Sequence, residues 1–181
     1  IAVAWDLGLD IEKIVGCLEN FEGIGRRFAD LGMHLAGDKS YQAIEDYGHH
    51  PTEIEATISA ARQGWPEQRL VVVFQPHRYS RTRDLFDDFS RVLSEADVAV
   101  LTEVYAAGEA PIDGVDSRAL CQSIRARGKV DPVLVPGIEE VLPVLEDLVL
   151  DGDLVLLMGA GSIEQVAQNL RDSAVGEGAS S

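Results

Sequence analysis

Reactive side chains are concentrated in one eight-residue segment, Asp46–Glu53, which reads Asp-Tyr-Gly-His-His-Pro-Thr-Glu. Its carboxylates, phenol and imidazoles are groups that can bind a polar ligand or move a proton. The alternative is ordinary turn chemistry, with the histidines as turn residues and Asp46 as a capping residue. We favour a functional segment, because this density of reactive groups lies just before a helix that Pro51 is well suited to open.

A metal site is a weaker interpretation of the paired histidines. Adjacent His49 and His50 are poorly placed to bind one ion together, and the sequence has neither a CxxC nor an HxxxH motif to complete a site. Cys17 and Cys121 lie far apart, so we expect two reduced thiols, as in a cytoplasmic protein, and no disulfide. No set of metal ligands is therefore predicted in this chain.

A second reactive segment, Gln75–Arg83, holds three arginines although the chain carries a formal charge of −16. Guanidinium groups bind carboxylates and phosphates through paired N–H donors. We predict that Arg78 and Arg81 bind an anion near the start of the following helix. Arg83 is expected instead to pair with neighbouring aspartates on the helix surface.

Other loops are less informative. Glu109 follows a flexible glycine and is equally compatible with a surface loop and with the wall of a site. Gly159–Ser162 is a glycine-rich turn, but neither GxGxxG nor GxxxxGK[ST] occurs, so close packing of a strand and a helix is the better interpretation. Arg125 is assigned to a helix C-terminus, while Arg26 and Arg27 could face either solvent or a ligand.

The secondary structure that positions these loops is predicted by the hydrophobic pattern. Apolar strands alternate with amphipathic helices, an order that requires a parallel sheet covered on both faces. The expected strands are 70–74, 98–104, 133–135 and 154–158, and the expected helices are 51–63, 82–93, 116–126, 138–148 and 163–171. Two extended segments, 27–35 and 41–45, and a helix over 11–21 capped by Asp10 precede them.

The predicted fold class is therefore α/β, with a doubly wound, mostly parallel, Rossmann-like sheet preceded by a helix from a neighbouring domain. Gly23–Gly25 is a break suited to a domain boundary or hinge. The Gly-, Ala- and Ser-rich segment Ser173–Ser181 is expected to be disordered. Ligands of such sheets bind beyond the carboxyl ends of the strands, where the reactive loops fall.

Composition narrows the possible partners. The charge of −16 disfavours nucleic acid, which needs a basic surface to neutralise its phosphates. No apolar run approaches the ~18 residues of a membrane span, and the first residues lack the pattern of a secretory signal. We therefore predict no nucleic-acid partner, no membrane partner and a cytoplasmic location.

Four long motifs resemble the Mur ligase family. They are DYGHHPTE from Asp46, FQPHRYSRTRDL from Phe74, EVYAAGEAPI from Glu103 and MGAGSI from Met158. The likeness runs to about Leu170 and is greatest to the branch that joins L-alanine to UDP-N-acetylmuramate. The branch that recycles murein tripeptide is an alternative, although Tyr47-Gly48 and the His-Arg-Tyr-Ser-Arg run favour the alanine-adding branch. A non-catalytic domain that binds nucleotide or amino acid is another.

The resemblance implies a three-domain ligase that uses ATP and Mg²⁺ and passes through an acyl phosphate. Residues 1–25 would end its central ATP-binding domain, 26–172 would form its C-terminal domain, and 173–181 would be the tail. The family's phosphate-binding loop and metal ligands have no counterpart in this chain, so we expect the chain alone to be inactive.

The same resemblance assigns roles to individual residues. Arg27 and Asp46 would face the adenosine of ATP. The residues expected to line the site where L-alanine meets the muramoyl carboxylate are Tyr47, His49, His77, Arg78 and Arg81. Among these, His49, Arg78 and Arg81 are expected to lie closest to the chemistry.

Overall fold

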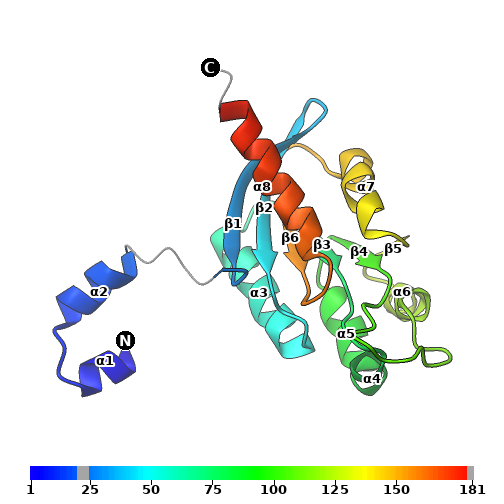
Figure 1. Ribbon diagram of the computed structural model, residues 1–181, viewed down its shortest axis with the longest axis horizontal. Helices are drawn as coiled ribbons and strands as arrows, with labels where there is room; N and C mark the ends of the chain where they lie inside the picture. The colour runs from blue at the N-terminus through cyan, green and yellow to red at the C-terminus, as the bar shows by residue number, and fades with distance from the viewer. Residues whose placement is uncertain (20–24, 179–181) are drawn as a thin grey trace.

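A six-stranded sheet forms the centre of the computed structural model, which describes residues 1–19 and 25–178. The strands are β1 (Ala29–Ala36), β2 (Lys39–Asp46), β3 (Leu70–Phe74), β4 (Val98–Thr102), β5 (Val133–Val135) and β6 (Asp153–Met158). Their order across the sheet is β1-β2-β6-β3-β4-β5, and only the β1–β2 pair is antiparallel (Figure 1). The predicted doubly wound, mostly parallel sheet is confirmed.

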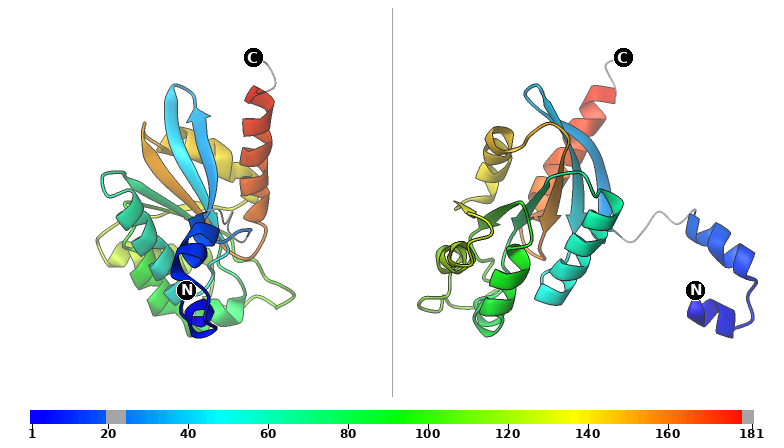
Figure 2. Two further views of the ribbon diagram at one scale, coloured as in Figure 1. Left: turned by 90° about the vertical axis from the view of Figure 1, so that its left-hand side faces the viewer. Right: turned by 180° about the vertical axis from the view of Figure 1, so that it is seen from behind.

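Helices cover both faces of this sheet (Figure 2). They are α3 (Pro51–Gly64), α4 (Tyr79–Asp84), α5 (Phe86–Leu93), α6 (Ser117–Ala126), α7 (Val141–Leu148) and α8 (Glu164–Gly178), with a 3-10 turn η1 (Ile138–Glu140) before α7. Two further helices, α1 (Ala2–Asp6) and α2 (Ile11–Glu19), precede the sheet. Within the two described ranges, no helix has the length and apolarity needed to cross a membrane.

The central strand β3 explains how one sheet supports two cores. All five of its residues are buried, and successive side chains point to opposite faces. Leu70, Val72 and Phe74 pack with α3, α5 and α6, whereas Val71 and Val73 pack with α7 and α8. Burying each of these side chains stabilises the fold by roughly 1.5–3 kcal/mol, so the apolar strands hold the loops at their carboxyl ends firmly in place.

The prediction of one helix over 82–93 is wrong, because two helices, α4 and α5, occupy this part of the chain. Arg78 turns the chain with φ 74°, so α4 begins at Tyr79, earlier than predicted. The helix then breaks at Leu85, whose backbone is non-helical (φ −119°, ψ 23°), and α5 follows. The half-buried Leu85 side chain packs against the core on the α5 face, a tertiary contact that overrides the local helical pattern.

The C-terminal segment also differs from expectation. Helix α8 continues to Gly178, so residues 173–178 are helical here, whereas the composition predicts disorder from Ser173. The Ser173 hydroxyl donates to the Leu170 carbonyl at 2.7 Å, and no proline interrupts the helix. Residues 179–181 lie outside the described part of the chain. So do residues 20–24, which include most of the predicted Gly23–Gly25 hinge; the hinge therefore stays a prediction.

The sheet topology has a switch point between β6 and β3, and the loops near it lie at the carboxyl-terminal edge of the strands. Neighbouring strands β6 and β3 send the helices that follow them to opposite faces, since α8 packs with one core and α5 with the other. Such divergence opens a space beyond the carboxyl ends of the strands. The loops that follow β2, β3, β4 and β6 all reach this edge.

Candidate functional site

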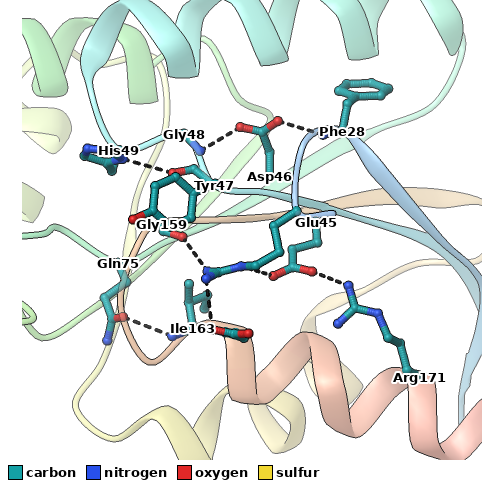
Figure 3. A network of polar contacts seen from close by, with 12 residues as sticks. Phe28, Glu45, Asp46, Tyr47, Gly48, His49, Gln75, Gly159, Ile163 and Arg171 are labelled. Atoms are coloured by element: carbon teal, nitrogen blue, oxygen red, sulfur yellow. Dashed lines mark hydrogen bonds and ion pairs between the residues drawn. The ribbon is translucent and has the colours of Figure 1, made fainter. Parts of the chain in front are cut away.

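The loop after β2 is built around the buried carboxylate of Asp46 (Figure 3). Asp46 Oδ1 accepts from the Gly48 amide at 2.7 Å, and Oδ2 accepts from the Phe28 amide at 2.8 Å. A Cβ atom at Gly48 would lie 2.7 Å from Asp46 Oδ1, so only glycine fits there without displacement. Asp46 thus ties the chain before β1 to the loop after β2, and both of its oxygens already accept from the backbone.

Helix α3 begins with the capping arrangement that Pro51 suggested. His50 is the N-cap and its Nδ1 accepts from the Thr52 amide at 3.3 Å. The amides of His49 and His50 both donate to Glu53 Oε2, at 3.0 and 3.1 Å. Partial burial would raise the pKa of Glu53, but these two amides, aided by His49 and Arg27, outweigh burial and lower it. Glu53 therefore stays ionised and holds the His49 backbone.

The His49 ring has a defined tautomer when neutral. Its Nδ1 lies 3.0 Å from the Tyr47 carbonyl oxygen, which can only accept, so Nδ1 carries the proton. Nε2 is then the nitrogen with a free lone pair. Because the ring is half-buried and Nδ1 is engaged, His49 offers one hydrogen-bond acceptor to a ligand at this edge.

Four rings from three loops form a continuous row, here called the ring row. Tyr47 meets His49 edge-on with centroids 5.2 Å apart, and His49 lies 5.7 Å from His77. His77 stacks on Tyr105 at 5.4 Å and 18°. The structure therefore brings the predicted Tyr47, His49 and His77 together, and adds Tyr105 from the loop after β4.

Arg81 fixes the opposite tautomer at His77. Arg81 Nη1 lies 3.2 Å from His77 Nδ1 and 3.2 Å from the His77 carbonyl oxygen. A guanidinium only donates, so Nδ1 accepts and the proton of neutral His77 sits on Nε2. Burial, then the charges of Arg81, His49 and Arg78, lower the pKa of His77 from its ordinary 6.5. At neutral pH His77 is thus an uncharged donor in the same row as the acceptor of His49.

The three arginines of the segment 75–83 have different surroundings. Arg78 is half-exposed, and its Nη1 lies 3.7 Å from Glu109 Oε1. Arg81 keeps Nε and Nη2 free of partners among the described residues while Nη1 contacts His77. Arg83 is exposed and pairs with Asp84 at 2.8 Å, which confirms its predicted surface role. Two guanidinium groups, those of Arg78 and Arg81, are left to bind an anion beside the ring row.

The two arginines before β1, Arg26 and Arg27, have different surroundings, which the sequence left open. Arg26 donates to Glu45 at 2.8 Å, to Glu164 at 2.8 Å and to the Gly159 carbonyl at 3.1 Å. Arg27 is half-exposed, 3.4 Å from Glu53, and its guanidinium lies 5.3 Å from the centre of the Tyr47 ring. Arg26 is therefore a structural residue, while Arg27 can still meet a ligand.

Sequence reasoning missed the ion-pair network beneath the site. Glu45 has only 2% of its side chain exposed, and its carboxylate binds both Arg26 and Arg171. These residues come from β2, from the segment before β1 and from α8, so they are far apart in sequence. No local motif signals such a network, because only the fold brings its members together.

Close packing explains the Gly159–Ser162 turn, as predicted. Gln75 Oε1 accepts from the Ile163 amide at 3.0 Å, and its Nε2 donates to Ser162 Oγ at 2.9 Å. A Cβ atom at Gly161 would lie 2.4 Å from Gln75 Oε1 and 2.6 Å from the Tyr105 ring. Gln75 thus fastens the loop after β6 to the end of β3, beside the ring row.

The described residues offer side chains that could hold part of a nucleotide, but no group of three or more metal ligands. Arg27 and Tyr47 could hold part of ATP, whereas Asp46 is buried and its oxygens accept from backbone amides in this conformation. Across residues 1–19 and 25–178, no cluster of three or more His, Cys, Asp or Glu side chains could hold a metal ion.

Comparison with known proteins gives a consistent picture. The sequence model described as "Mur ligase, glutamate ligase domain" matches residues 33–161. UDP-N-acetylmuramate–L-alanine ligases from Xanthomonas campestris pv. campestris (strain B100) and Xanthomonas euvesicatoria pv. vesicatoria (strain 85-10) are each 57% identical over 170 residues, 93% of this chain. The chain spans 36% of the length of these relatives.

Solved structures extend the likeness to the fold. A UDP-N-acetylmuramate-alanine ligase from Thermotoga maritima matches with a TM-score of 0.74 and 28% identity, covering 98% of this chain and 36% of that one. A murein peptide ligase from Psychrobacter arcticus matches with a TM-score of 0.59 and 18% identity, covering 95% of this chain and 34% of that one. The second match is a likeness of fold alone.

Proposed function

This chain belongs to the Mur ligase family, and we propose that it is the C-terminal, amino-acid-binding part of an ATP-dependent ligase that joins L-alanine to UDP-N-acetylmuramate. The observation that carries the proposal is the ring row with Arg78 and Arg81 beside it, in a chain 57% identical to such ligases. The reaction would supply peptidoglycan precursors.

Carboxylate recognition is the first duty we assign to this site. The free donors of Arg81 form a fork that suits a carboxylate, and half-exposed Arg78 adds a second positive charge. Since the pKa of His77 is lowered, His77 contributes a neutral Nε2–H donor at the same place. Together, the donors of Arg81, Arg78 and His77 suit the carboxylate of L-alanine.

Orientation of the amine is the second duty. ATP converts the muramoyl carboxylate into an acyl phosphate, and the amine of L-alanine then displaces phosphate. His49 Nε2 can accept a hydrogen bond from that amine, which orients it without acting as the general base. Tyr47 is the end ring of the row and lies next to Arg27, where we propose that part of the ATP binds. The ligands of Mg²⁺ we assign to the rest of the protein.

The division into domains is supported by the surface of the first two helices. Large apolar side chains of α1, α2 and the turn between them are 41–75% exposed. They are Ile1, Val3, Trp5, Leu7, Leu9, Ile11, Val15 and Leu18. So much exposed apolar area calls for a partner surface, and we propose that residues 1–25 complete a central ATP-binding domain while 26–172 form the C-terminal domain. The unpaired Cys17 and Cys121 suit a reducing cytoplasm.

The experiment is a phosphate-release assay on the full-length protein that carries this chain. We expect release that requires ATP, UDP-N-acetylmuramate and L-alanine together, and none from the 181-residue chain alone. Absence of L-alanine dependence in the full-length protein would refute the proposal. Release with murein tripeptide but not with L-alanine would move the protein to the recycling branch, and binding of ATP or L-alanine without any release would mark a non-catalytic domain.

A further inference from the structure

The loop after β4 contributes a carboxylate whose purpose the sequence leaves open. Glu109 Oε1 accepts from the Ser80 hydroxyl at 2.7 Å, and Oε2 accepts from the Ser80 amide at 2.9 Å. Glu109 is thus bound to the first turn of α4 by both oxygens. Arg78, two residues before Ser80, lies 3.7 Å away, a longer contact than either hydrogen bond to Ser80.

Arg78 needs such support because its backbone is unfavourable for a side chain other than glycine. It has φ 74° and ψ 134°, outside the regions that L-residues normally occupy. Its amide donates to the Tyr105 carbonyl at 2.8 Å, and its carbonyl accepts from the Thr82 amide at 3.1 Å and hydroxyl at 2.9 Å. A conformation of this kind persists when surrounding contacts fix it, and such residues gather at functional sites.

The loop that carries Glu109 is itself shaped to return toward α4. The Tyr105 amide donates to the Pro76 carbonyl at 2.8 Å, which fixes the start of the loop against the end of β3. Ala107 and Gly108 follow with φ 49° and 85°, and the Glu109 amide donates to the Ala106 carbonyl at 3.0 Å. Two successive positive φ angles reverse the chain and bring the carboxylate to Ser80.

We propose that Glu109 is a positioning residue that fixes the start of α4, and with it the guanidinium of Arg78, for binding the substrate carboxylate. The proposal rests on the proposed function. Glu109 does not need to touch substrate: its hydrogen bonds go to Ser80, and the 3.7 Å contact leaves most Arg78 donors for a ligand. The Ser80 amide and hydroxyl, with the charge of Arg78, lower the pKa of Glu109, so the clamp is ionised at neutral pH.

The test compares Glu109→Ala and Glu109→Gln with Asp113→Ala in the full-length protein. Asp113 is an exposed carboxylate on the same loop and has no hydrogen bond or ion pair among the described residues, so its variant is a matched loss of charge. We expect Glu109→Ala to raise the KM for L-alanine about 10- to 100-fold, since small misplacement of a binding group has effects of this size. The KM for ATP should not change, and Glu109→Gln, which can still accept from Ser80, should recover part of the loss.

A second measurement does not depend on activity. Hydrogen exchange of the peptide covering residues 75–85 in the full-length protein should be faster in Glu109→Ala, because the Ser80 amide loses its acceptor, and unchanged in Asp113→Ala. Ser80→Ala should reproduce part of the KM effect and add little when combined with Glu109→Ala, since both variants disrupt the same contact between Ser80 and Glu109. If Glu109→Ala does not fold, Ser80→Ala and Glu109→Gln carry the test.

The outcomes separate the two proposals. If the wild-type protein releases phosphate with L-alanine but Glu109→Ala matches Asp113→Ala in KM, the positioning role is wrong. The same conclusion follows if exchange at 75–85 is equal in the two variants. If the wild type does not use L-alanine at all, the proposed function fails, while faster exchange in Glu109→Ala would still support the clamp on α4.

Discussion

Replacing Arg81 by alanine in the full-length protein should damage the use of L-alanine severely. Arg81 supports His77 through Nη1 and keeps Nε and Nη2 for a carboxylate. A charge-assisted hydrogen bond contributes about 1.5–3 kcal/mol, which corresponds to about a 10- to 150-fold change in rate. Because the variant also releases the His77 ring, we expect the upper end of this range in kcat/KM for L-alanine.

The assay is phosphate release as a function of L-alanine concentration at saturating ATP and UDP-N-acetylmuramate. Arg83→Ala is the matched control, because Arg83 lies two residues after Arg81 on α4 and, among the described residues, its side chain pairs with exposed Asp84 alone. It should stay within about twofold of the wild type, as surface substitutions usually do. Calorimetric affinity for UDP-N-acetylmuramate should be equal in both variants. An unchanged KM for L-alanine in Arg81→Ala would refute the role assigned to Arg81.

Three further predictions concern stability. Gly48→Ala should lower the free energy of unfolding by about 1–3 kcal/mol in urea titration, because its Cβ would lie 2.7 Å from Asp46 Oδ1; equal stability would show that the loop yields freely. Arg26→Ala should cost about 1–3 kcal/mol by the same titration, since buried Glu45 loses one of its two cationic partners; no loss would show that Arg171 alone is a sufficient partner for Glu45. Because the pKa of His77 is lower in the folded protein, the unfolded chain binds a proton at His77 before the folded protein does as the pH falls through 6.5. The free energy of unfolding should therefore decrease between pH 6.5 and the pKa of His77 in the folded state. His77→Gln should flatten that part of the stability curve, and an unaltered slope would contradict the shift.

The layers of the fold were predictable because the apolar strands are local in sequence. β3 is a run of five apolar residues, and its flanking helices carry regular apolar faces. The break at Leu85 was not predictable, since the segment 82–93 keeps a helical pattern and only contact with the core separates α4 from α5. The continuation of α8 to Gly178 was not predictable, because the segment from Ser173 has the Gly-, Ala- and Ser-rich composition that is typical of disorder.

The candidate site was predictable where one motif contains several of its residues. Tyr47 and His49 lie in one short motif, and His77 and Arg81 in another, so their residue types alone indicated a site. The contact between the two motifs, with His49 5.7 Å from His77, depends on adjacent strand ends and could be inferred only from topology. The tautomers of the two rings and the clamp formed by Glu109 depend on distances that no sequence pattern encodes.

The most direct test of the central claim is the mass of the product formed by the full-length protein. The protein is incubated with ATP, UDP-N-acetylmuramate and equal concentrations of L-alanine and murein tripeptide. We predict that the sugar nucleotide gains the mass of one alanine residue, and that Arg81→Ala suppresses this product far more than Arg83→Ala does. Attachment of the tripeptide instead, or no covalent product with wild-type protein, would contradict the account.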